Sequence, residues 1–176
     1  MKKYKVALFI GRFQPFHNGH LYSLEKCLEL ADKVTIVVAK SNVSGTKDDP
    51  WDYKIRKMMV CEVVRGMGIE SRIEKIVSCP DNPSDKKWVT DVKKRAGKFD
   101  VVVSNNEWTL NALKASGYEV VQQGLYNRDE LEGVKIREMM RSGDEGWKLR
   151  VPGSVVQLIG DSVYQAIGAS ISRKDK

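Results

Sequence analysis

Apolar residues in this chain gather in five short runs, spaced along its first two thirds. The runs cover residues 5–10, 33–40, 72–79, 100–105 and 118–123 and are rich in valine and isoleucine. Short runs of β-branched residues bounded by Gly, Pro, Asn or Ser predict buried strands. We therefore expect five strands. Their nearly continuous hydrophobicity is typical of strands in a sheet that is covered on both faces.

Between and after these runs, apolar residues recur every three or four positions, which is the spacing of an amphipathic helix. This spacing predicts helices over residues 20–31, 52–68, 107–117, 134–143 and 154–168, and a short one from Trp88. Strands that alternate with helices and lack hairpin turn signals indicate right-handed crossovers. The expected fold is α/β: a Rossmann-like, doubly wound parallel sheet of five strands with helices on both faces and further helices at the C-terminus.

The 176 residues fit one domain, and the chain shows no internal repeat or linker. We expect a single domain over 1–176, with a C-terminal helical part at about 132–170 and a basic tail at 172–176. The apolar runs are too short to span a bilayer, so no membrane association is expected. Three cysteines without C-x-x-C spacing and the lack of a leader-like segment predict a cytoplasmic protein.

A formal net charge of +7 favours a negatively charged ligand. The lysines and arginines are scattered over the expected helices, and no basic stripe with interleaved aromatic residues is present. Nucleic-acid binding is therefore the weaker alternative. Phosphorylated small molecules suit this charge better.

Both histidines of the chain lie in "GRFQPFHNGH", residues 11–20, directly after the first expected strand. A strand, a Gly- and Pro-containing loop and a helix start form an anion site in many α/β sheets, because the first helical turn has free N–H groups. Asn18 is the expected N-cap, Gly19 allows close backbone approach, and Arg12 adds a forked donor. The alternative is a capping histidine beside a second one packed on the sheet.

Other sites for chemistry are disfavoured. The chain has no G-x-x-x-x-G-K-[ST] or G-x-G-x-x-G motif. Two histidines alone do not complete a zinc site, and no serine or cysteine stands in a nucleophile motif. In open parallel sheets ligands bind beyond the carboxyl ends of the strands, where residues 11–20 and 104–106 are expected.

"GRFQPFHNGH" resembles the motif of the H-x-G-H nucleotidyltransferases, in the form found in archaeal-type nicotinamide-mononucleotide (NMN) adenylyltransferases. Further segments are similar to that family: "DPW…IRKMM" (49–59), "PDNPSDKKWV" (80–89), "FDVVVSNN" (99–106), and "LYNRDELEGVKIR" (125–137), which corresponds to its second phosphate motif. The resemblance covers most of the chain.

The resemblance implies a role for each matching residue. His17, His20, Arg137 and Arg12 would hold phosphates as the catalytic group, and Asp81 and Trp88 would lie on the nicotinamide side, with Trp88 stacked on the ring. The nucleotide-binding residues would be Gly11, Arg12, Phe13, Gln14, Phe16, Gly19, Asn105, Asn106, Arg128, Gly133, Val134 and Ile136.

The resemblance implies that the NMN phosphate attacks the α-phosphorus of ATP in line, giving NAD and pyrophosphate, with Mg²⁺ or another divalent cation accompanying ATP. A phosphate nucleophile needs no catalytic base, so positioning and charge neutralisation would supply the catalysis. The resemblance also implies a homo-oligomer. Acceptor alternatives are pantetheine phosphate and flavin mononucleotide (FMN), and a nucleotide-binding homologue without catalysis is the alternative from another class.

Four positions depart from the family pattern. The second phosphate motif has Glu132 and Val134 where the family has Ser and Thr around the glycine, so two hydroxyl donors are missing. Asp48 occupies a position that is basic in relatives. Asp85 stands where relatives have asparagine near the nicotinamide, and its charge would favour a cationic pyridinium or indicate a different acceptor.

Overall fold

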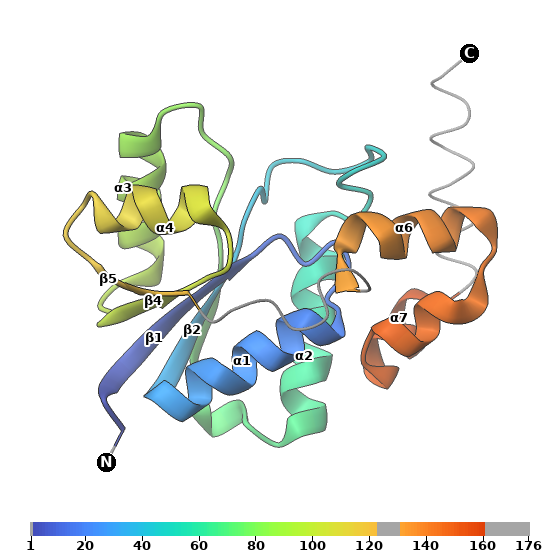
Figure 1. Cartoon of the computed structure of the whole chain (residues 1–176), viewed down its shortest axis with the longest axis horizontal. Helices are drawn as coiled ribbons and strands as arrows, with labels where there is room; N and C mark the ends of the chain where they lie inside the picture. The colour runs from blue at the N-terminus through green and yellow to red at the C-terminus, as the bar shows by residue number, and fades with distance from the viewer. Residues whose placement is uncertain (1, 123–130, 161–176) are drawn as a thin grey trace.

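A five-stranded parallel sheet forms the centre of the protein, as the computed structural model shows for the described residues, 2–122 and 131–160 (Figure 1). The strand order is β3-β2-β1-β4-β5. The strands are β1 (Tyr4–Gly11), β2 (Ala31–Val38), β3 (Ile73–Ser78), β4 (Val101–Val103) and β5 (Glu119–Val121). This confirms the predicted parallel α/β sheet, although β4 and β5 are shorter than their apolar runs.

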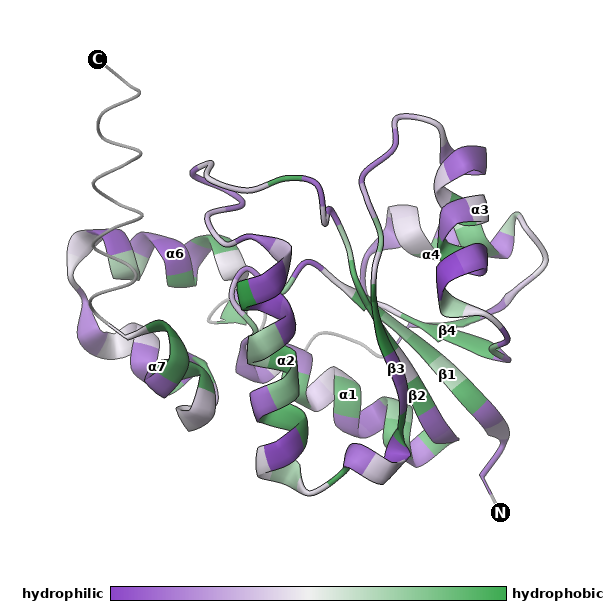
Figure 2. Ribbon diagram, turned by 180° about the vertical axis from the view of Figure 1, so that it is seen from behind, coloured by the Kyte–Doolittle hydropathy of each residue, from purple (hydrophilic) through white to green (hydrophobic). Residues whose placement is uncertain are grey.

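Helices cover both faces of the sheet, because side chains of successive strand residues point to opposite sides. In β1, Ala7 and Phe9 pack in one core cluster, and Leu8 and Ile10 pack in the other. The first cluster lies under α1 (Asn18–Leu30) and α2 (Tyr53–Met67); the second lies under α3 (Asp85–Ala96) and α4 (Glu107–Lys114). Figure 2 shows the hydrophobic strands between helices whose outer surfaces are hydrophilic.

The C-terminal part continues the layer of α1 and α2. Helix α6 (Gly133–Ser142) is followed by a 3-10 helix (Glu145–Arg150) and by α7 (Gly153–Ile159), which packs against α2. Another 3-10 helix, Glu70–Arg72, precedes β3. The expected helix over 154–168 is described up to Ile159, and its remainder and the tail 172–176 lie outside the described residues. No helix in the described part has the length and apolar character needed to cross a bilayer.

The third helix begins earlier than the sequence predicted. We expected it to start at Trp88, but α3 starts at Asp85 with Ser84 as its N-cap. The hydroxyl oxygen of Ser84 accepts a hydrogen bond from the backbone N–H of Lys87 at 3.5 Å, which satisfies one free donor of the first turn. Trp88 therefore lies within the helix and points into the core.

The order of strands reverses between β1 and β4. From β1 the chain builds outward through β2 and β3, and it then returns to place β4 on the other side of β1, with Ala7 opposite Val101 and Phe9 opposite Val103. The segments that leave these two strands, at Gly11 and Ser104, diverge to opposite faces of the sheet. Such a point is where open α/β sheets form ligand sites.

Candidate functional site

A cavity of about 640 Å³ opens at the reversal point, beyond the carboxyl ends of β1 and β4. Its volume lies in the range of small-molecule sites. Most of the residues singled out in the sequence line it: Gly11, Arg12, Phe13, Gln14, His17, Gly19, His20, Asp81, Trp88, Asn105, Asn106, Gly133, Val134 and Arg137. Segments separated by more than 120 positions are thereby brought to one site.

Three of the predicted binding residues stand apart from this group. Phe16 and Ile136 are fully buried in the core cluster under α1 and α2 and are not among the described residues that line the cavity. Arg128 lies outside the described residues.

His17, and not Asn18, caps helix α1. His17 has extended backbone angles (φ −130°, ψ 171°), and its Nδ1 accepts the backbone N–H of His20 at 3.3 Å. In return, Nδ1 of His20 accepts the backbone N–H of His17 at 3.2 Å. This reciprocal pair is a capping box made of two imidazoles. The prediction that Asn18 is the N-cap was wrong, because the Asn18 side chain instead donates to the Leu149 carbonyl at 3.0 Å.

The capping box fixes the proton of each neutral imidazole on Nε2, because Nδ1 acts as the acceptor. Burial, strengthened by the positive charge of Arg137, lowers the pKa of His17 to about 4. Burial also lowers the pKa of His20 well below its ordinary value, and His17 and Arg12 add to this effect. Both side chains are therefore neutral at pH 7 and can donate one Nε2–H bond each.

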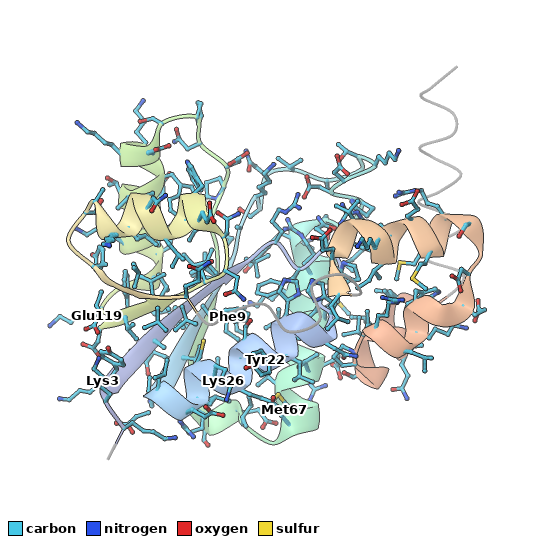
Figure 3. The ribbon with its side chains drawn as sticks, viewed as in Figure 1. Lys3, Phe9, Tyr22, Lys26, Met67 and Glu119 are labelled. Carbon is cyan, nitrogen blue, oxygen red and sulfur yellow. The ribbon has the colours of Figure 1, made fainter. Side chains whose placement is uncertain are left out.

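Aromatic rings enclose His20 and explain its burial. The ring centroids of Phe13 and Phe16 lie 4.9 Å and 5.4 Å from that of His20, and His17 stacks on it at 3.7 Å. Phe9, which Figure 3 labels near the end of β1, contacts it edge-on at 6.5 Å. The apolar walls hold the imidazole in one orientation and disfavour its charged form.

Two glycines make room for this arrangement. A Cβ atom at Gly11 would lie 2.6 Å from the ring of Phe13, so the turn after β1 closes only without a side chain. A Cβ atom at Gly19 would lie 3.0 Å from Nδ1 of His17, inside the capping box. The motif therefore requires both glycines for the packing of its own aromatic and imidazole rings.

Arg137, in the first two turns of α6, lines the same cavity as the histidines. Its side chain is 2% exposed, and one terminal nitrogen donates to the carbonyl oxygen of Gln14 at 2.7 Å. The other terminal nitrogen lies 3.4 Å from a carboxylate oxygen of Asp48, whose side chain is 71% exposed. The guanidinium is thus fixed against the first motif, with an acidic side chain from the 40–52 loop beside it.

Arg12 is held in a similar way at the cavity edge. It is 3.5 Å from Asp49, a carboxylate that is 4% exposed. The two arginines of the site are therefore each near one of two adjacent aspartates. The two carboxylates partly balance the positive charge of the arginines, and the Arg12 side chain, 43% exposed, is accessible at the cavity edge.

Arg56, which lies in the family-like segment 49–59, is a structural residue of the site that was not among the predicted site residues. It is completely buried in α2 and donates to the backbone carbonyls of Arg12 (2.8 Å), Ala39 (2.7 Å) and Lys40 (2.9 Å). These carbonyls belong to the segments that follow β1 and β2. Arg56 therefore fixes the backbone on which Arg12 and Lys40 approach the cavity.

The N-terminal ends of three helices face the cavity. Residues of the first turn or cap line it in α1 (His17, His20), in α4 (Asn106, Thr109) and in α6 (Glu132, Gly133). Each helix N-terminus carries a partial positive charge, so the cavity favours a ligand with several anionic groups.

Trp88 lies in the cavity wall but is almost wholly buried, with 2% of its surface exposed. Trp108 is the second residue of α4, and its ring contacts that of Trp88. The two ring centroids are 4.6 Å apart and the ring planes are at 56°. Trp108 is 43% exposed. Trp108 was not among the residues predicted for the site; an aromatic residue two positions after a polar helix cap at a strand end was the signal that could have found it.

The low pKa of His17 predicts a pH-dependent stability. Because the folded state binds the proton less readily than the unfolded chain, whose histidine has its ordinary pKa of 6.5, stability is complete above about pH 6.5 and falls as the pH drops towards about 4. Urea unfolding at pH 7 and pH 5 measures the change. The double variant His17→Asn with His20→Asn should show a smaller loss between these pH values. An equal loss in both proteins would contradict the buried neutral state.

Comparison with known proteins tests the resemblance found in the sequence. A family model described as cytidylyltransferase-like matches residues 8–139, which include "GRFQPFHNGH" (11–20) and Arg137. The chain belongs to the cytidylyltransferase-like family. The nicotinamide-nucleotide adenylyltransferase of Pyrobaculum aerophilum is 35% identical over 155 residues, which are 88% of this chain and 87% of that protein. The corresponding enzyme of Haloarcula marismortui is 36% identical over 153 residues, 87% and 79% of the two chains.

A solved structure confirms the fold of this member of the cytidylyltransferase-like family. It is a bifunctional NMN adenylyltransferase/ADP ribose pyrophosphatase from Francisella tularensis, complexed with AMP and a manganese ion. The TM-score is 0.75 at 20% sequence identity, and the match covers 94% of this chain and 52% of that one. This chain therefore spans about half of that protein's length.

Proposed function

We propose that this protein is an NMN adenylyltransferase, which joins ATP and NMN to give NAD and pyrophosphate. The observation that carries the proposal is that two Nε2–H donors on α1 and the buried Arg137 of α6, which is bonded to the Gln14 carbonyl of the same motif, line one cavity. Relatives at 35% and 36% identity over most of the chain, which are named nicotinamide-nucleotide adenylyltransferases, support it.

The donors of the site match the charges that develop in adenylyl transfer. When the acceptor phosphate attacks the α-phosphorus of ATP, the bond to the bridging oxygen breaks and negative charge accumulates on the leaving pyrophosphate. In our proposal His17 and His20 donate to the phosphates from the α1 side, and Arg137 and Arg12 neutralise the outer phosphates. Removing one preorganised donor of this kind typically costs about 10²–10³-fold in rate.

Neutral histidines can perform this task. The neutral imidazoles already hold their protons on Nε2, so they donate hydrogen bonds without gaining or losing a proton during the reaction. No side chain has to deprotonate the nucleophile, because the acceptor phosphate is already an anion. The residues that line the cavity therefore have two tasks. They align the acceptor phosphate with ATP, which it repels, and they neutralise the negative charge of the phosphates.

In this proposal Mg²⁺ or another divalent cation enters with ATP. Among residues 2–122 and 131–160, no group of three or more His, Cys, Asp and Glu side chains could hold a metal ion. Mg²⁺ is commonly bound through substrate phosphates and water with only one or two carboxylates. A metal ion carried by the triphosphate fits the donors of this cavity.

The acceptor assay tests the proposed function. Wild-type protein is incubated with ATP, Mg²⁺ and one acceptor at a time: NMN, pantetheine phosphate or FMN. We expect NAD and pyrophosphate from NMN and little turnover of the other acceptors. Turnover of another acceptor without NAD formation would contradict the proposal, and so would nucleotide binding without release of pyrophosphate, the result for a homologue that has lost catalysis.

Asp48 gives a prediction about ATP affinity. Replacing Asp48 with Asn should lower the KM for ATP by up to about fivefold, because it removes a carboxylate that lies beside Arg137 and repels the triphosphate. Asp32→Asn removes the same charge at the opposite end of the sheet and serves as the control. An unchanged or higher KM for ATP in Asp48→Asn alone would show that the aspartate does not oppose ATP.

A homo-oligomer, a cytoplasmic location and one nucleotidyltransferase domain over 1–176 stay predictions of the sequence. The three cysteines are free, and Cys27 and Cys79 are buried, which agrees with a reducing compartment. Mass measurement in solution would test the oligomer.

A further inference from the structure

Gln14, in the middle of the first motif, uses its side chain to bind another part of the protein. Only 3% of its surface is exposed. Its Nε2 donates to the carbonyl of Trp51 at 2.8 Å, and its Oε1 accepts the backbone N–H of Trp51 at 3.1 Å. Trp51 is itself fully buried, so these two bonds are shielded from water. The amide of Gln14 therefore ties the 40–52 loop to the motif.

The segment that precedes Trp51 is a closed turn. The backbone N–H of Gly45 donates to the carbonyl of Pro50, and that of Thr46 donates to the carbonyl of Asp49, both at 3.3 Å. In return, the backbone N–H of Asp49 donates to Oγ1 of Thr46 at 2.9 Å. Because these bonds connect the two arms of the turn, the turn follows Trp51 as a unit.

This turn brings two carboxylates to the two arginines of the site. Asp48 lies 3.4 Å from Arg137, and Asp49 lies 3.5 Å from Arg12. Arg137 also donates to the backbone carbonyl of Gln14 at 2.7 Å. Gln14 therefore contacts the turn's anchor with its side chain and the cation beside the turn with its backbone.

Asp48 occupies a place where an anionic ligand of Arg137 would bind. Its side chain is 71% exposed, so it can move aside when a phosphate group approaches the guanidinium. A carboxylate in such an exposed ion pair weakens the binding of a competing anion by up to about fivefold. The size of this effect depends on how firmly the turn holds the carboxylate beside Arg137.

We propose that Gln14 is a positioning residue for ATP binding: by holding the Trp51 backbone, it keeps the Asp48 carboxylate beside Arg137, where the carboxylate competes with the triphosphate. The proposal rests on the proposed function and extends it to what sets the affinity for ATP. Gln14→Met keeps the length of the side chain but can form neither bond to Trp51, so it should free the turn and tighten ATP binding. A purely structural residue predicts the opposite, since loosening a loop beside a site reduces its preorganisation.

The test is a double-mutant cycle on the Kd for ATP, measured by calorimetry with Mg²⁺ and without acceptor. Asp48→Asn should lower this Kd about threefold, and Gln14→Met should lower it about twofold to threefold. In the Gln14→Met background, adding Asp48→Asn should change the Kd by less than about 1.5-fold, because the carboxylate has already left Arg137.

Val92→Ala is the control for a general loss of stability. Val92 is fully buried in α3 and lines neither the cavity nor the turn, so its replacement should leave the Kd for ATP within about 1.5-fold. Should Gln14→Met fail to fold, Thr46→Val replaces it, since Thr46 is exposed and its change removes one bond that closes the turn. Thr90→Val, at an exposed position of α3, is the matched control for that variant.

Tighter ATP binding in Gln14→Met together with loss of the Asp48→Asn effect would support the proposal. A Kd for ATP that is unchanged or raised in Gln14→Met, or an Asp48→Asn effect of full size in that background, would overturn it. The same two results decide the matter in Thr46→Val if that variant is used. Wild-type protein that binds ATP but forms no NAD from NMN would reject the proposed function alone, and wild-type protein that does not bind ATP would reject both.

Discussion

Replacing His17 or His20 with alanine should lower turnover by about 10²-fold or more, because each change removes a preorganised Nε2–H donor to the phosphates. Alanine also removes half of the capping box that begins α1, which costs about 1 kcal/mol of stability. Turnover and unfolding by urea should therefore both be measured for each variant.

Two further variants separate catalysis from capping. His17→Asn and His20→Asn each put an amide oxygen where Nδ1 stood, so they can accept the N–H groups of residues 20 and 17. The shorter asparagine side chain places no donor where Nε2–H stood. We expect both variants to be nearly as stable as the wild type and as slow as the alanine variants. Near-normal turnover of His17→Asn and His20→Asn would show that the imidazoles have only a structural role.

Arg137→Lys should lower kcat/KM for ATP by about 10²–10³-fold although the positive charge is kept. The guanidinium uses one terminal nitrogen to bond the Gln14 carbonyl and presents the other towards the Asp48 side of the cavity. The single ammonium of lysine cannot reproduce this fork. The effect should fall on ATP, and the KM for NMN should change less.

Arg141→Lys provides the control on the same helix. Arg141 lies one turn further along α6, is exposed, and donates to the Lys47 carbonyl at 3.5 Å. Its replacement should leave kcat/KM for ATP within about twofold, since it is a surface substitution outside the cavity. If Arg137→Lys and Arg141→Lys behaved alike, a specific role for the buried guanidinium in phosphate binding would be ruled out.

Much of the fold could be predicted because its signals are local. The β-branched runs of β1 and β2 and the three-to-four spacing of α2 arise from residues close in sequence. Helix ends were harder to predict because caps depend on side-chain geometry. The start of α3 at Asp85 depends on one side-chain hydrogen bond to Ser84, and the capping of α1 depends on the reciprocal pair between His17 and His20.

Site residues that belong to a sequence motif were predicted. Site residues that are brought to the cavity only by the tertiary structure were missed. The H-x-G-H motif and Arg137 were found from the sequence and its resemblance to a family, and the structure brings them to one cavity. Arg56 resembles any arginine on a helix until the carbonyls of Arg12 and Lys40, 44 and 16 positions away, are placed around it. Trp108 becomes distinctive only beside Trp88, which belongs to another helix.

The most direct measurement of the proposed chemistry follows the α-phosphorus of ATP. Wild-type protein is supplied with ATP labelled at the α-phosphate, NMN and Mg²⁺, and the products are separated. In-line transfer of the adenylyl group predicts that the label appears in NAD, with one unlabelled pyrophosphate released for each NAD formed, and that His17→Asn and Arg137→Lys slow both products equally. Recovery of all label as ATP, or as AMP without NAD, would contradict the proposed adenylyl transfer.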